Sequence, residues 1–111
     1  MTYRIVPTKS FLKDLKRLRK KYASIDDDLL VMGNEILNNP RLGDEVYKNC
    51  YKIRFAIRSK GKGKSGGGRI ITFVKVENQL IYLLSIYDKS DQETVSDQFI
   101  KLLLSEIDNQ E

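Results

Sequence analysis

Hydrophobic and polar positions alternate strictly over residues 51–58, which is the pattern of a β-strand with one buried face. The apolar positions of this segment are Tyr51, Ile53, Phe55 and Ile57. The positions between them are Lys52, Arg54, Ala56 and Arg58. We therefore expect a strand that buries one side and presents a row of cations on the other.

Two segments before this strand carry apolar residues at helical spacing. The first follows a short expected strand at residues 3–6, and Thr8 or Ser10 is placed to cap it. The second opens at Ser24 with a capping-box pattern, and residues 38–40, Asn-Asn-Pro, end it. Because only a residue or two separates the two segments, they are expected to form an antiparallel helix hairpin.

The rest of the chain predicts three successive strands and a last helix. The strands fall at residues 50–58, 69–76 and 80–87, and the helix carries apolar positions from 95 to 107. A polar loop is expected at 41–48, and a mobile basic loop at 59–68, which is almost all Lys, Gly and Ser. The order β-α-α-β-β-β-α indicates one α+β domain over residues 1–111, with an antiparallel sheet, the helix hairpin on one side and a C-terminal helix.

Charge is distributed unevenly along the chain. The net charge is +5, and between Glu45 and Glu77 there are nine Lys or Arg and no acidic residue. Segregation of this kind favours an anionic partner, most plausibly nucleic acid. With a lone cysteine, Cys50, no expected signal peptide and no long apolar run, we expect a cytoplasmic protein without a membrane contact.

Several kinds of chemistry fit the sequence poorly. There is no histidine, so a Ser or Cys triad lacks its usual base, and the basic region lacks the carboxylates of a metallonuclease. Gly63-Lys64-Ser65 resembles the end of a phosphate-binding P-loop, but the required earlier glycine is Arg58 and a strand follows instead of a helix. We expect neither a metal nor another cofactor.

Basic residues alone can cleave RNA, because RNA carries its own nucleophile, the 2′-hydroxyl. A lysine among other cations has its pKa lowered from about 10.4 and can act as a general base, while arginines bind the phosphate. Lys52, Arg54 and Arg69 would lie together if their strands pair across the basic loop, and Lys89 could join them. Phosphate binding without turnover fits the composition equally well.

Three motifs carry a family resemblance: C-Y-K-I-R-F before the basic loop, G-G-R-I-I-T-F after it, and L-L-S-I-Y-D-K in the following strand. With the order of elements, they resemble the RelE/HigB toxins of bacterial type II toxin–antitoxin systems. The stretch K-S-G-G-G-R resembles the HigB-like branch. The resemblance implies an mRNA endoribonuclease that cuts codons in the ribosomal A site, and a cognate antitoxin that neutralises it.

The resemblance also implies roles for particular residues. Lys52 matches the lysine proposed to activate the 2′-hydroxyl, Arg54 the second basic residue, and Arg69 the phosphate-stabilising arginine. Lys89 falls where the family commonly has an arginine that assists the leaving group. The family tyrosine of the last helix has no counterpart between residues 92 and 99, so Tyr87 is the candidate for stacking on a base. Four side chains of the basic loop are expected to contact RNA: Arg58, Lys60, Lys62 and Lys64.

Two other functions stay open on the same scaffold. A ParE-type toxin inhibits DNA gyrase and needs no catalytic basic set, so the combination of Lys52, Arg54 and Arg69 argues against it. A non-catalytic RNA-binding module needs the cations but not their alignment.

Overall fold

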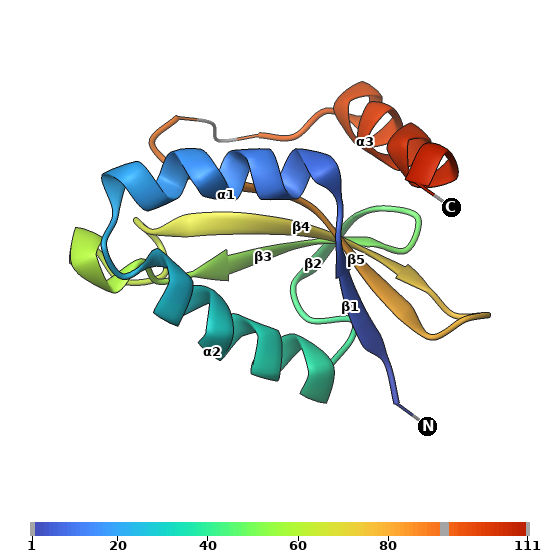
Figure 1. Ribbon diagram of the computed structural model, residues 1–111, viewed down its shortest axis with the longest axis horizontal. Helices are drawn as coiled ribbons and strands as arrows, with labels where there is room; N and C mark the ends of the chain where they lie inside the picture. The colour runs from blue at the N-terminus through green and yellow to red at the C-terminus, as the bar shows by residue number, and fades with distance from the viewer. Residues whose placement is uncertain (1, 92–93, 111) are drawn as a thin grey trace.

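The computed structural model describes residues 2–91 and 94–110. The chain folds in the order β1 (Arg4–Pro7), α1 (Lys9–Lys21), α2 (Ile25–Asn38), β2 (Asp44–Tyr47), β3 (Cys50–Phe55), a short 3₁₀ turn η1 (Arg58–Lys60), β4 (Gly68–Lys75), β5 (Leu80–Asp88) and α3 (Asp97–Gln110) (Figure 1). The prediction of an α+β domain with a helix hairpin and a C-terminal helix is confirmed. No helix in the described ranges is long and apolar enough to cross a bilayer.

The five strands form one sheet in the order β1-β5-β4-β3-β2. Pairing is antiparallel between β2, β3, β4 and β5, whereas β1 lies parallel to β5, from Arg4 beside Leu80 to Pro7 beside Leu83. The expected antiparallel sheet is therefore corrected at its first strand. Parallel pairing is possible here because a long connection, which includes the helix hairpin and β2 to β4, separates β1 from β5.

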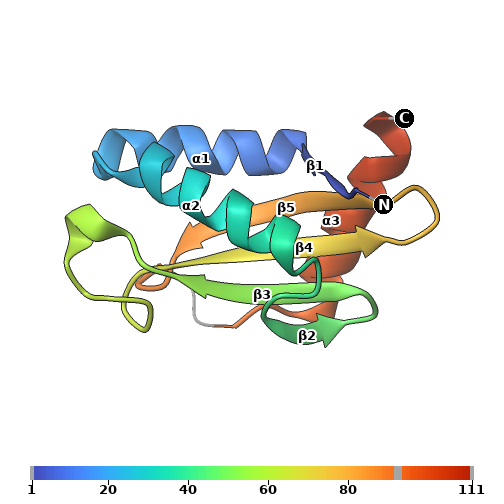
Figure 2. The same cartoon turned by 90° about the horizontal axis from the view of Figure 1, so that it is seen from below.

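Each face of the sheet carries its own hydrophobic core. The first core packs α1 and α2 against residues such as Ile53, Phe55 and Ile70. The second packs α3 against residues such as Cys50 and Ile71. Figure 2 shows α2 in front of the strands and α3 behind them. The alternation over residues 51–58 corresponds to a strand only as far as Phe55, because residues 56 and 57 lie outside β3 and Arg58 begins η1. Ile53, Phe55 and Ile57 face the first core as expected.

Local signals explain most element ends. Thr8 caps α1, and its Oγ1 accepts a hydrogen bond from the Phe11 amide at 3.3 Å. Ser24 precedes α2 without the predicted capping-box bond; its hydroxyl donates instead to Asp28 at 2.6 Å. At α3, which begins only at Asp97, the Ser96 hydroxyl accepts from the Phe99 amide at 3.1 Å.

Two segments expected to be loops are organised. Residues 44–47 form β2, paired with β3 through Asp44 beside Lys52, so the prediction of an irregular loop at 41–48 is wrong there. The basic loop at 59–68 begins with a 3₁₀ turn and ends in buried glycines. A Cβ on Gly67 would lie 2.3 Å from the Phe55 carbonyl oxygen, so only glycine allows this close approach. The end of the loop is therefore packed against β3, whereas residues 61–65 are exposed.

Candidate nucleic-acid interface

Strand pairing aligns three of the four predicted catalytic residues on one face of the sheet. Arg54 of β3 lies directly opposite Arg69 of β4, which in turn lies opposite Tyr87 of β5. Lys52 is two residues before Arg54, so its side chain leaves the same face. Residues opposite one another on paired strands have Cβ atoms about 4.5–5.5 Å apart. The backbone register therefore places Arg69 beside the strand that carries Lys52 and Arg54, as the sequence analysis expected if the two strands pair.

The guanidinium of Arg69 holds the basic loop. The residue is only 6% exposed. Its Nη1 donates to the carbonyl oxygens of Lys64 at 3.0 Å and Gly68 at 2.8 Å, and its Nη2 donates to that of Ser65 at 3.1 Å. These bonds use three of the five N–H groups of the side chain. Arg69 therefore fixes the loop backbone and leaves few donors for a phosphate.

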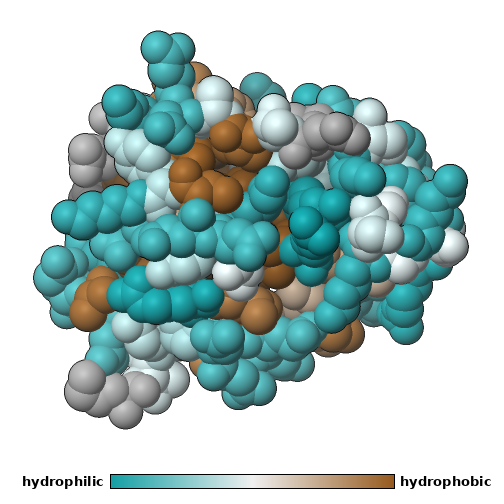
Figure 3. Space-filling view, turned by 180° about the vertical axis from the view of Figure 1, so that it is seen from behind, coloured by the Kyte–Doolittle hydropathy of each residue, from teal (hydrophilic) through white to brown (hydrophobic). Residues whose placement is uncertain are grey.

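Lys52 and Arg54 line a cleft of about 490 Å³ at the β3 side of the sheet. Lys64 of the basic loop lines the same cleft, as do two carboxylates, Glu35 of α2 and Asp44 of β2. No hydrogen bond or ion pair to another described residue restrains the side chains of Lys52, Arg54 or Lys64. Figure 3 shows the molecule from behind, where hydrophilic side chains cover most of the surface and hydrophobic side chains show between them. The cleft thus holds three cations without an ion pair to a described residue, together with two carboxylates, and such cations can bind a phosphate group.

Lys89 lies outside this cleft. It lines a smaller groove of about 260 Å³ together with Lys60, Lys62, Gly66 and Ser90. Its backbone amide donates to the Gly67 carbonyl oxygen at 3.0 Å, which places it at the far side of the basic loop. The structure thus divides the predicted site residues between two basic surfaces, one on each side of the basic loop.

Two of the four predicted loop contacts are already neutralised by buried carboxylates. Arg58 donates from its backbone amide and from Nε to Asp28, at 3.1 and 3.0 Å. Lys60 lies 2.6 Å from the carboxylate of Asp88, and its side chain is 13% exposed. The exposed side chains of Lys62 and Lys64, by contrast, have no ion pair within the described ranges. These two lysines are the better candidates for RNA contacts.

The carboxylate of Asp88 links several elements of this region, and this role was not predicted from the sequence. Its carboxylate is fully buried and accepts hydrogen bonds from Lys60, Tyr22 and both the amide and hydroxyl of Ser90. Burial alone would raise the pKa of Asp88, but the hydrogen bonds from Lys60, Ser90 and Tyr22 outweigh it and lower the pKa far below its ordinary value. Asp88 therefore stays ionised and connects α1, the basic loop and the end of β5.

Tyr87, the candidate for base stacking, lies below the surface. It is 8% exposed, and its hydroxyl has no hydrogen-bond partner within the described residues. Burial raises the pKa of this phenol, and the nearby Arg69 opposes the change. A base cannot lie flat on its ring in this arrangement.

Among the described residues, no group of three or more His, Cys, Asp or Glu side chains is arranged to hold a metal ion. The three aspartates that begin α2 are divided between separate structural contacts. Asp26 pairs with Arg19 at 2.9 Å, while Asp28 is buried beside Arg58.

Comparison with solved structures identifies the class of fold. A double arginine-to-alanine mutant of the Escherichia coli toxin RelE in the free state matches with a TM-score of 0.59 and 20% identity, over 99% of this chain and 98% of that one. The crystal structure of the isolated E. coli RelE toxin in its P21 form matches with a TM-score of 0.57 and 21% identity, over 93% and 97% of the two chains. The protein therefore has a RelE-like fold over essentially its whole length. No protein-family model matches the sequence.

Proposed function

We propose that the protein is the toxin of a type II toxin–antitoxin system, and that it cleaves mRNA on the ribosome and inhibits translation. The observation that carries the proposal is the cleft that brings together the side chains of Lys52, Arg54 and Lys64, none of which makes an ion pair with another described residue. The RelE-like fold supports it, because RelE itself is a toxin. The HigB-like branch, a cognate antitoxin and the ribosome with A-site mRNA as partners, and a cytoplasmic location belong to the same proposal.

The proposed reaction is a transesterification that requires no metal. The 2′-oxygen of a ribose attacks the adjacent phosphorus, loses its proton to a base, and displaces the 5′-oxygen of the next nucleotide, which takes up a proton. The products are a 2′,3′-cyclic phosphate and a free 5′-hydroxyl. Lys52 is the proposed base, and Arg54 stabilises the charge on the phosphoryl oxygens.

The position of Lys89 bears on which residue supplies the proton taken up by the leaving 5′-oxygen. Because Lys89 lines the groove on the far side of the basic loop, it serves the leaving group only if the RNA spans both surfaces. Glu35 lies in the cleft with Lys52 and is a second possible proton acceptor there. Arg69 acts chiefly by holding the loop that carries Lys64, in addition to the phosphate contact expected for it.

The test is to map RNA 5′ ends after induced expression of the protein in bacteria. Cuts within translated codons, with a 2′,3′-cyclic phosphate on the upstream fragment, support the proposal. Lys52→Ala is expected to slow cleavage by about 10²–10⁴-fold, as loss of a general base does, and Arg54→Ala by about 10²–10³-fold. Lys16→Ala, on the exposed face of α1, is the matched control.

The alternatives predict different results. DNA damage without codon cuts indicates a ParE-type gyrase inhibitor, and neither effect indicates a non-catalytic RNA-binding module. Codon cleavage that is unchanged in both Lys52→Ala and Arg54→Ala would show that the site has been assigned to the wrong residues.

A further inference from the structure

An apolar groove of about 370 Å³ lies along α2, beside the edge strand β1. Ile5 of β1 and Leu83 of β5 contribute to it, and the rest of its lining comes from α2. Among the described residues that line it, only Asp26 and Asn34 are polar. Figure 2 shows α2 on the outer side of the sheet, so a partner can reach this helix from solvent.

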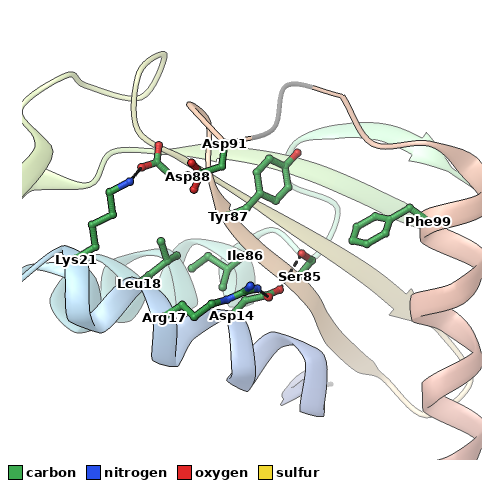
Figure 4. A pocket seen from close by; sticks show the side chains of 10 residues that line it. All are labelled: Asp14, Arg17, Leu18, Lys21, Ser85, Ile86, Tyr87, Asp88, Asp91 and Phe99. Carbon is green, nitrogen blue, oxygen red and sulfur yellow. Dashed lines mark hydrogen bonds and ion pairs between the residues drawn. The ribbon is translucent and has the colours of Figure 1, made fainter.

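The pocket between α1 and the end of β5 is of a different kind (Figure 4). Its charged side chains bond within the protein: Lys21 lies 3.3 Å from Asp88, and Asp14 accepts from the Ser85 hydroxyl at 3.2 Å. Internal contacts therefore account for most of the polar groups there. The groove on α2 instead leaves apolar side chains exposed.

Three residues of α2 form a stripe along this groove. Leu30, Gly33 and Leu37 lie on one face of the helix, because residues three, four and seven positions apart are neighbours on its surface. The side chains of Leu30 and Leu37 are 69% and 43% exposed. One exposed leucine is ordinary, but two that border the same apolar groove indicate an interaction surface.

Gly33 lies between the two leucines, and no contact within the described chain requires a glycine there. Its backbone is helical, and a Cβ at this position would lie 4.0 Å from Ile5 Cδ1, an ordinary contact distance. Glycine is less favourable than alanine inside a helix. A glycine that the fold does not need, placed in an apolar groove, indicates close approach of a group from outside.

We infer that this groove binds an amphipathic helix of a protein partner, with a small side chain packed on Gly33 and basic residues at the end that meets the start of α2. A nucleic acid is disfavoured, because no Lys or Arg among the described residues lines the groove. An added strand is disfavoured too, because β1 has only four residues and ends at Pro7, which lacks an N–H.

The charge at one end of the groove favours a basic partner. Every charged residue of α2 is acidic, and the side chains of Asp26 and Asp27 at its start are 61% and 78% exposed. Asp26 lies 2.9 Å from Arg19 and Asp27 lies 3.8 Å from Arg58, but exposed pairs of this kind are weak. A second copy of this chain would bring another α2 without a cation, so the fitting occupant is a different protein.

A partner bound in this groove leaves the basic cleft open. The cleft is lined by Met32 and Glu35, which lie on the opposite side of α2 from Gly33. The groove and the cleft share no lining residue. A docking site here is therefore independent of the proposed function.

The test is to titrate the full chain with a synthetic helical peptide as long as α2, which has 14 residues, and to follow binding by NMR. The peptide carries a leucine stripe at helical spacing, an alanine within the stripe and two lysines at one end. Its binding should shift the amide signals of Leu30, Gly33 and Leu37. Gly33→Ala should weaken binding by roughly tenfold or more, because its methyl group fills the contact, while the melting temperature stays unchanged or rises.

Two comparisons separate the groove from general stickiness. Val31→Ala removes a side chain of α2 that is 54% exposed but lies outside the groove, and it should bind the peptide as the wild type does. A peptide with glutamates in place of its lysines should bind about threefold or more weakly at low salt. Asp27→Asn should reduce that difference.

Other outcomes overturn the inference. Absence of binding, or equal binding by Gly33→Ala and the wild type, would show that the groove is not a docking site. Tighter binding of the glutamate peptide would exclude a basic partner. A dimer of the chain alone in sedimentation, lost in Gly33→Ala, would assign the groove to a second copy. None of these results depends on RNA cleavage, so failure of the proposed function is recognised separately.

Discussion

Replacing Asp88 by Asn tests how the basic loop is held to the rest of the fold. The fully buried carboxylate accepts from Lys60 Nζ at 2.6 Å, and a second charge, Lys21, lies 3.3 Å away. Removing one partner of a buried ion pair costs about 3–5 kcal/mol, because the other charge is left uncompensated. The side chain of Lys60 is 13% exposed, so water relieves part of this penalty. We therefore expect a loss of about 3 kcal/mol in the free energy of unfolding.

This loss is large enough to measure and small enough for the variant to fold. Domains of this size have unfolding free energies of about 5–15 kcal/mol, and about 3 kcal/mol corresponds to a melting temperature lower by about 12 °C. Circular dichroism melts and urea unfolding at pH 7 measure both quantities. Glu77→Gln, an exposed carboxylate in the turn between β4 and β5, controls for the loss of one negative charge.

The ion pair also gives the stability a definite pH dependence. The pKa of Asp88 is lower in the folded protein than its unfolded value of about 3.9, so its contribution is complete above about pH 5 and declines as the pH falls below about 4. The Asp88→Asn variant lacks this titration, so the difference in free energy of unfolding between the wild type and the variant should become smaller between pH 5 and pH 2. A difference under about 1 kcal/mol at pH 7, or one that stays the same in acid, would refute the argument that Asp88 anchors the loop.

Two further results are expected from the packing. Gly68→Ala should destabilise the fold by about 1–3 kcal/mol, because a Cβ there would lie 2.5 Å from the Phe55 ring. Gly33→Ala on α2 should instead stabilise the fold by up to about 1 kcal/mol, because the nearest neighbour of a Cβ there is 4.0 Å away. Urea unfolding of the two variants should show changes of opposite sign, and equal changes would contradict the packing described here. Cys50 should not react with a thiol reagent until the protein unfolds, since it is fully buried and desolvation raises its pKa to about 12; rapid labelling of the native protein at pH 8 would show that β3 opens.

Much of the fold could be predicted from local patterns. The alternation over residues 51–57 fixes which face of β3 is buried, and apolar spacing defines α1 and α2. The strand β2 was missed because it has only four residues and its apolar side chains, Val46 and Tyr47, are adjacent instead of alternating. The parallel position of β1 was missed because turn lengths say which successive strands pair, but not where an N-terminal strand joins the sheet.

The candidate site could be predicted only in part, and for a related reason. Lys52 and Arg54 stand out because an exposed strand face shows directly in the sequence. The contacts that organise the loop join residues far apart in the chain: Lys60 with Asp88, 28 residues away, and Tyr22 with Asp88, 66 residues away. A single aspartate at the end of a strand carries no sign that it will be buried among such partners, so the role of Asp88 could not be predicted.

The basic loop determines how activity data on Arg69 should be understood. Its guanidinium bonds to the carbonyls of Lys64 and Ser65, so its removal frees the loop that places Lys64 in the cleft with Lys52 and Arg54. The opposite end of the same loop is held by the Lys60–Asp88 pair, beside the groove that contains Lys62 and Lys89. A drop in cleavage on Arg69→Ala therefore has two physical causes, a lost phosphate contact or a displaced loop. Asp88→Asn, which disturbs the loop while leaving Arg69 in place, separates them: if the two variants lose activity equally, loop position accounts for the effect of Arg69, and only an excess loss in Arg69→Ala is evidence for a direct phosphate contact.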